Sequence, residues 1–87
     1  MYKTTFTKRA LKQLKKIDKP TAALITGWIR KNLEGCENPR AIGKALTANM
    51  AGQWRYRVGD YRIIAEIIDE SVLILVINIG HRSDIYK

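Results

Sequence analysis

The hydrophobic positions of this chain repeat with a helical period near the N-terminus and with a strand period near the C-terminus. Residues 1–6 are rich in threonine and aromatic side chains and predict a short strand. In residues 7–17, Ala10, Leu14 and Ile17 follow one another at spacings of four and three. Such spacings place them on one stripe of a helix, and the remaining positions are mostly basic.

A second helix is predicted directly after the first. Asp18 can cap its start, Pro20 fits its first turn, and Gly35 suits its C-terminal end. The two helices therefore form an αα-hairpin. The apolar stripe of the second helix comprises Ala22, Ile25, Trp28 or Ile29, and Leu33.

The period changes to two at Trp54. Residues 54–58 and 61–69 predict two strands joined by a Gly59–Asp60 hairpin turn, and a third strand covers residues 72–80. We expect Trp54, Tyr56 and Val58 on the core side of the first of these strands. The strands are apolar on both faces, and two helices can cover only one, so the other face is left for binding.

Residues 36–53, between the helices and the strands, contain Pro39, two glycines and weak periodicity. They predict a long loop over the surface, which can include a helical turn at 40–46. The whole chain of 87 residues is then one α+β domain of order β-α-α-β-β-β. Its small antiparallel sheet carries the αα-hairpin on one face.

The register of the predicted hairpin brings two arginines together. With a two-residue turn at Gly59–Asp60, Arg57 lies opposite Arg62, and opposed residues share a face. Arg55 lies on the same face as Arg57. Two like charges side by side are destabilising unless an anion lies between them, or unless Asp60 or Glu66 screens them. We favour a site for a bound anion.

The C-terminal segment adds more polar chemistry. The third strand ends at Gly80 and is followed by His81, Arg82 and Tyr86. Antiparallel pairing returns residues 77–80 beside residues 61–64, at the end of the sheet that holds the arginines. Five groups can therefore converge, namely Arg57, Arg62, His81, Arg82 and Tyr86.

Such a cluster suits metal-free RNA cleavage, in which the 2′-hydroxyl attacks the adjacent phosphate. Guanidinium groups bind phosphate bidentately and stabilise charge in the transition state. His81 can serve as base, acid or phosphate ligand, and Tyr86 as base or as the group that positions the 2′-hydroxyl. The single histidine and single cysteine, 45 positions apart, predict no metal site and no cofactor.

The charge supports a nucleic-acid partner. Sixteen Lys and Arg against eight Asp and Glu give a net charge of +8. Residues 1–35 hold nine basic and two acidic groups, so most of the excess lies in the helical part. Sequence-independent phosphate contacts are expected from Lys8, Arg9, Lys12, Lys15 and Lys16. No apolar segment reaches membrane-spanning length, so we expect a cytoplasmic protein without a membrane partner.

Residues 54–87 resemble the RelE branch of the RelE/ParE toxin superfamily of bacterial type II toxin–antitoxin modules. The resemblance rests on the "RVGDYRI" hairpin, the "DE" turn and the closing "GHRSDIY", with "RALKQLKKID" similar to the family's first helix. It implies a ribonuclease that cleaves mRNA in the ribosomal A site and inhibits translation. It also implies a cognate antitoxin that silences the toxin, and a complex that binds operator DNA through the antitoxin.

Carried over by position, the resemblance makes Arg62 and Arg82 phosphate-contacting residues and Tyr86 the terminal catalytic tyrosine. Arg55 and Arg57 fall where the family often has lysine, and His81 where it has lysine or histidine. An antitoxin helix or strand would bind to the open sheet face or to residues 36–53. Two alternatives remain: a ParE-like inhibitor of DNA gyrase, and an inactive module that binds RNA or antitoxin.

Overall fold

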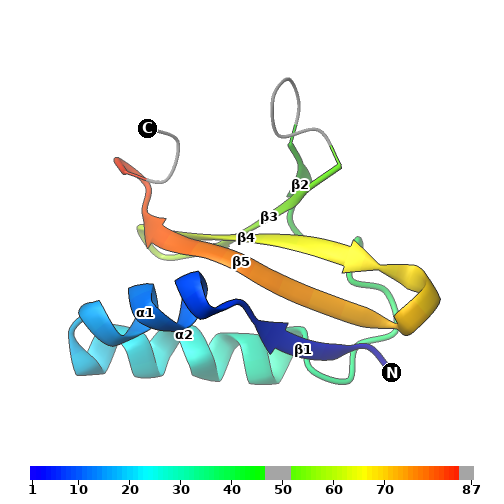
Figure 1. The fold of residues 1–87 in the computed structure, drawn as a ribbon, viewed down its shortest axis with the longest axis horizontal. Coiled ribbons are helices and arrows are strands. Elements are labelled where there is room, and N and C mark those ends of the chain that lie inside the picture. Colours follow the sequence, from blue (N-terminus) through cyan, green and yellow to red (C-terminus); the bar gives the residue numbers. More distant parts are fainter. Residues whose placement is uncertain (47–51, 85–87) are drawn as a thin grey trace.

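The computed structural model describes residues 1–46 and 52–84, which form two layers (Figure 1). The helices are α1 (Lys8–Lys16) and α2 (Lys19–Asn32), with a short 3₁₀ helix at Asp69–Ser71. The strands are β1 (Lys3–Phe6), β2 (Lys44–Ala45), β3 (Trp54–Val58), β4 (Tyr61–Ile68) and β5 (Leu73–His81).

The predicted α+β fold is confirmed, and the sheet is larger than expected. Its five strands have the order β1-β5-β4-β3-β2, with β3, β4 and β5 forming the predicted antiparallel meander. β1 joins the other edge by pairing parallel to β5, so the sheet is mixed rather than wholly antiparallel. Both helices lie on one face, and no helix of the described residues covers the opposite face (Figure 1).

Local capping explains where the helices begin. The hydroxyl of Thr7 accepts a hydrogen bond from the Ala10 N–H at 3.1 Å and so caps α1. The Asp18 carboxylate accepts from the Thr21 N–H at 3.1 Å and caps α2, where Pro20 occupies the first turn. The break between the helices therefore follows from three residues, 18 to 20, as the sequence predicted.

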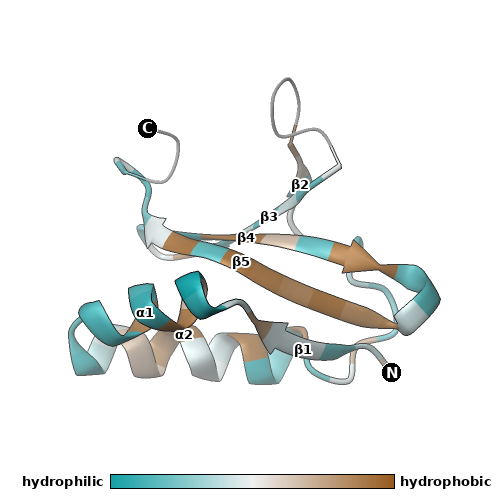
Figure 2. Ribbon diagram, viewed as in Figure 1, coloured by the Kyte–Doolittle hydropathy of each residue, from teal (hydrophilic) through white to brown (hydrophobic). Residues whose placement is uncertain are grey.

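The core lies between the helices and the inner face of the sheet. Ala10, Ile25, Ile29 and Leu33 of the helical layer are buried against it. From the sheet, the fully buried side chains include Tyr56, Ile63, Ile74 and Val76. Figure 2 shows this contrast as brown central strands over an α1 whose ribbon is largely teal. The predicted core assignments of Tyr56 and Val58 are confirmed, with Trp54 partly buried beside them.

The β5 edge is completed by α1 rather than by a longer β1. The last pair of β1 with β5 is Phe6 with Val76. Beyond it, the Gln13 side chain takes the place of a strand: its Oε1 accepts from the Ile79 N–H at 2.7 Å. Its Nε2 donates to Asn78 Oδ1 at 2.6 Å. The N-terminal half of the chain thereby fixes the end of β5, where the candidate site begins.

Residues 40–46 form no helix, so the predicted helical turn is wrong. Lys44–Ala45 instead pairs with Arg55 and Trp54 as strand β2. Gly43 makes this approach possible, because a Cβ there would lie 2.4 Å from the Arg55 carbonyl oxygen. Its φ of +79° is also one that glycine adopts without strain. Residues 47–51 lie outside the described part of the chain.

Candidate functional site

The open face carries a group of cations that the strand register fixes. Arg57 is paired with Arg62, as predicted, and Lys44 is paired with Arg55. Because Arg55 and Arg57 are two residues apart on one strand, all four side chains lie on the same face. We call Lys44, Arg55, Arg57 and Arg62 the open-face cluster.

A cavity of about 260 Å³ lies within this cluster, lined by Gly43, Lys44, Arg55 and Arg57. Three of its four lining residues are cationic, so the cavity favours an anion. Lys44 was missed by the sequence analysis. The signal available was a lysine next to a glycine in the long loop, which becomes meaningful only once β2 is known to pair with β3.

Arg62 is held more tightly than the other cations. Its exposed fraction is only 9%, and its Nη1 donates long hydrogen bonds of 3.3 Å to the carbonyls of Gly59 and Tyr61. Both acceptors are neutral backbone groups, so the guanidinium charge is not neutralised by them. Among the residues that the structure describes, no carboxylate forms an ion pair with Arg62, and a buried guanidinium in this state is suited to attract a phosphate.

The loop that presents Lys44 is anchored on its inner side. The buried hydroxyl of Tyr56 donates to the Pro39 carbonyl at 2.6 Å, and Trp54 Nε1 donates to the Ile42 carbonyl at 2.7 Å. Burial raises the pKa of Tyr56, so its hydroxyl stays protonated and remains a donor. Strand β3 therefore holds the loop from below through its own core-facing aromatic residues.

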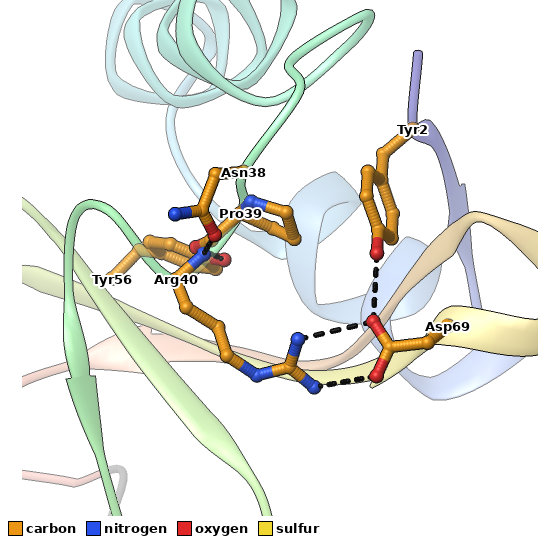
Figure 3. Close-up of polar contacts among 6 residues, drawn as sticks. All are labelled: Tyr2, Asn38, Pro39, Arg40, Tyr56 and Asp69. Carbon is orange, nitrogen blue, oxygen red and sulfur yellow. Dashed lines mark hydrogen bonds and ion pairs between the residues drawn. The ribbon is translucent and has the colours of Figure 1, made fainter.

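A second anchor joins this loop to the β4–β5 turn (Figure 3). The Arg40 guanidinium donates from Nη1 and Nη2 to the two oxygens of Asp69, each at 3.0 Å, and Tyr2 Oη donates to Oδ1 at 2.7 Å. The hydrogen bonds from Arg40, then that from Tyr2, lower the pKa of Asp69. Three distant segments thus meet at one carboxylate, which fixes where the loop leaves the sheet.

The tail returns to the predicted end of the sheet. The Arg82 N–H donates to the Asp60 carbonyl in the β3–β4 turn at 2.8 Å, and the Asp84 N–H donates to the His81 carbonyl at 2.9 Å. Figure 1 shows residues 82–84 rising on the side away from the helices. The Arg82 backbone therefore lies beside the Arg57–Arg62 pair, and its side chain is exposed. Tyr86 lies outside the described residues.

His81 lies on the other side of the sheet, so its predicted convergence with Arg57 and Arg62 is wrong. It is paired with Tyr61, a core-side residue, and their rings make an edge contact at 5.5 Å. The cause is a bulge: Ala65 pairs with Val76 but Ile64 with Asn78, which leaves one extra residue in β5. One extra residue exchanges the faces of all later side chains.

The predicted basic surface of α1 is present as a row of exposed side chains. It comprises Lys8, Arg9, Lys12, Lys15 and Lys16. These residues lie on the helical layer, away from the open-face cluster. The two positive regions are therefore separate parts of the surface.

Within residues 1–46 and 52–84, no group of three or more His, Cys, Asp or Glu side chains is placed to hold a metal ion. Neither helix in this part of the chain has the length and apolar character that crossing a membrane requires.

Comparison with known proteins identifies the family. Residues 5–86 match the model described as the ParE toxin of the type II toxin–antitoxin system parDE. The chain belongs to the RelE/ParE toxin superfamily. This confirms the resemblance inferred from the C-terminal motifs.

Two curated relatives of this RelE/ParE toxin are similar over almost their whole length. Toxin RelG of Mycobacterium tuberculosis is 30% identical over 86 residues, which are 99% of this chain and 97% of that protein. A putative RelE-like toxin protein of Escherichia coli is 30% identical over 89 residues, with coverages of 99% and 90%. The family model is named for ParE and these relatives for RelE, so the names leave the branch open.

Solved structures show the same fold. The toxin–antitoxin complex RelBE2 of M. tuberculosis contains a chain with a TM-score of 0.85 at 29% identity, covering 95% of this chain and 93% of that one. The isolated E. coli RelE toxin has a TM-score of 0.72 at 24% identity, with coverages of 99% and 92%. At that identity, the second likeness concerns the fold alone.

Proposed function

We propose that this toxin is a metal-free endoribonuclease that cleaves mRNA, in the ribosomal A site, and so inhibits translation. The observation that carries the proposal is the open-face cluster: four cations on adjacent strands, with a cavity of about 260 Å³ among them. A surface built only for solubility has no reason to place Arg57 directly opposite Arg62.

The proposed reaction needs no external reagent. The 2′-oxygen of the RNA forms a bond to the adjacent phosphorus, the bond from phosphorus to the 5′-oxygen breaks, and a 2′,3′-cyclic phosphate results. The proton of the 2′-hydroxyl passes to a base, and the leaving 5′-oxygen gains a proton. A second negative charge develops on the non-bridging oxygens at the transition state, where fixed guanidinium groups act most strongly.

The residues divide into three roles under this proposal. Arg57, Arg62 and Arg82 hold the scissile phosphate, while Lys44 and Arg55 hold a neighbouring one. Tyr86 remains the candidate for proton transfer, because His81 lies on the other side of the sheet from these arginines. The exposed cations of α1 supply contacts to the phosphates of ribosomal RNA, which bring the toxin to its substrate without reading sequence.

A cognate antitoxin is the proposed protein partner, in the cytoplasm where the ribosome is also found. The RelBE2 structure of M. tuberculosis and the intact RelBE structure of E. coli are both toxin–antitoxin complexes. A net charge of +8 favours an acidic antitoxin. Operator binding through the antitoxin belongs to the same proposal.

Primer extension on a message in a translating extract tests the reaction. Wild-type toxin should cut within the A-site codon and should do so in the presence of a metal chelator at a level the ribosome tolerates. Arg82→Ala and Tyr86→Ala should each lose most of the cutting, whereas Arg30→Ala, which removes an exposed cation of α2, should retain it.

The same extract separates the other two functions. Intact mRNA together with inhibited supercoiling by DNA gyrase would establish the ParE-like alternative. This alternative is motivated by the matching family model, which is named for ParE. Intact mRNA with normal supercoiling would indicate an inactive binding module. Undiminished cutting by both variants would refute the assignment of Arg82 and Tyr86.

A further inference from the structure

A second cavity lies on the helix side of the sheet, between α1 and the end of β5. Its volume is about 200 Å³, and it is lined by Arg9 and Gln13 from α1, by residues 78–81 of β5, and by Asp84. Arg9 and Gln13 are four residues apart and share one face of the helix. Because Gln13 is bonded to the Ile79 N–H, Arg9 is carried to the same edge of the strand.

His81 offers two hydrogen-bond donors at this edge. Backbone N–H groups alternate in direction along β5: that of Ile79 points to Gln13, and that of Arg82 points to the β3–β4 turn. The N–H of His81 therefore points outward, toward the cavity. The imidazole of His81 lies on the helix side of the sheet, as the cavity does, because its ring contacts Tyr61 on the core side.

Ser83 decides which ring nitrogen of His81 carries the proton. The Ser83 backbone N–H donates to Nδ1 at 3.2 Å, and the Ser83 hydroxyl lies 2.8 Å from the same atom. A backbone N–H can only donate, so Nδ1 must accept. The neutral ring consequently carries its proton on Nε2, which is then a donor and not a base.

The charges around the cavity leave a cation available. Arg9 is exposed, and within the described part of the chain it has no hydrogen bond or ion pair. Asp84 is the one carboxylate among the described residues of the lining, and it already has an interaction partner. Gln13 Nε2 donates to Asn78 Oδ1, which holds both side chains beside the cavity. The Arg9 guanidinium and the two donors of His81 are groups that suit a phosphate.

We propose that Arg9 and His81 form a second phosphate subsite on the helix side, with Ser83 as the residue that positions His81. The proposal rests on the ribonuclease function above and deepens it: the subsite holds a backbone phosphate of the bound RNA on the helix side of the sheet. His81 is then a hydrogen-bond donor to that phosphate. The base that accepts the 2′-hydroxyl proton must be another group.

Nuclear magnetic resonance tests the subsite without relying on cleavage. The chain has one histidine, so an untagged sample gives a single set of ring signals. In alkaline solution, where imidazoles are neutral, a long-range ¹H–¹⁵N spectrum should show a protonated Nε2 and an unprotonated Nδ1. A protonated Nδ1 would overturn the role assigned to Ser83.

Ligand binding is followed on the same signals. Inorganic phosphate and a short single-stranded DNA, which lacks the 2′-hydroxyl and is not cleaved, should both shift them. Arg9→Gln should weaken both effects about tenfold, as expected for one charged hydrogen bond. Arg30→Gln, an equal change of charge on α2, should leave them unchanged. Equal effects of the two variants, or shifts with inorganic phosphate alone, would overturn a nucleic-acid subsite.

Kinetics then separate this proposal from the ribonuclease function. Ser83→Ala should lower kcat about three- to tenfold, and Ser83→Thr, which keeps the hydroxyl, should restore it. Arg9→Gln should raise KM for RNA more than it lowers kcat. If wild type cleaves no RNA while the ring signals respond as described, the ribonuclease proposal fails and the phosphate subsite stands.

Discussion

The two cationic regions of this toxin differ in how their charges are held. The open-face cluster lies on paired strands, and its Arg62 is 9% exposed and bonded to the hairpin turn. The α1 cations are exposed side chains of a surface helix. Fixed guanidinium groups can meet a developing charge without reorganisation, whereas mobile exposed cations contribute salt-dependent affinity. Net charge alone therefore does not tell where the chemistry lies.

The largest effect should come from removing the most fixed charge. Arg62→Ala should lower the single-turnover cleavage rate by roughly 10²–10³, the loss typical of one preorganised electrostatic group. Arg62→Lys should recover little, because an ammonium group lacks the bidentate fork. Circular dichroism must show both variants folded. A folded Arg62→Ala protein that cuts at the wild-type rate would place the reaction elsewhere.

A substitution at Gly43 tests whether the cluster depends on the approach of β2. Gly43→Ala places a Cβ 2.4 Å from the Arg55 carbonyl oxygen at a φ of +79°, so the loop must move. We expect a loss of about 1–3 kcal/mol in the free energy of unfolding, together with reduced cleavage. Gly27→Ala is the matched control: its Cβ meets nothing within 4 Å, and alanine should stabilise α2 slightly.

The anchor beneath the loop should matter less. Tyr56→Phe removes the hydroxyl that donates to the Pro39 carbonyl and keeps the aromatic ring in the core. The expected loss is about 1 kcal/mol, which urea denaturation can measure. The cleavage rate should fall only to the extent that the substitution displaces Lys44. An unchanged midpoint of urea denaturation would show that the hydrogen bond from the Tyr56 hydroxyl does not stabilise the fold.

Affinity rather than rate should respond to the α1 surface. Lys12→Gln should reduce the slope of log affinity for single-stranded RNA against log salt by about 0.7 and leave the single-turnover rate intact. Fluorescence anisotropy at several salt concentrations measures the slope. A rate loss as large as that of Arg62→Ala would remove the distinction between the two regions.

The sequence predicted the parts of the site that depend on local pattern. The two-residue turn sets the register of β3 and β4, so Arg57 opposite Arg62 could be derived before any coordinates. The face that His81 occupies could not be derived, because the bulge in β5 adds one residue and has no sequence pattern of its own in a run that is apolar apart from Asn78. Lys44 was equally hidden, since two residues are too few to show a strand period. Both errors concern features set by tertiary contacts.

The smallest effect should come from the surface anchor of the loop. The folded-state pKa of Asp69 is lowered, chiefly by Arg40, so the contact stabilises the fold above the unfolded carboxyl pKa of about 3.9 and is lost as the pH falls through the lower folded value. Wild type should therefore be more stable than Asp69→Asn at neutral pH, and the two melting temperatures should converge as the pH falls below about 4. Both groups are largely exposed, at 44% and 54%, so solvent screening keeps the difference small. If the difference in melting temperature persists in acid, Asp69 acts through packing, and its charge does not hold the loop that presents Lys44.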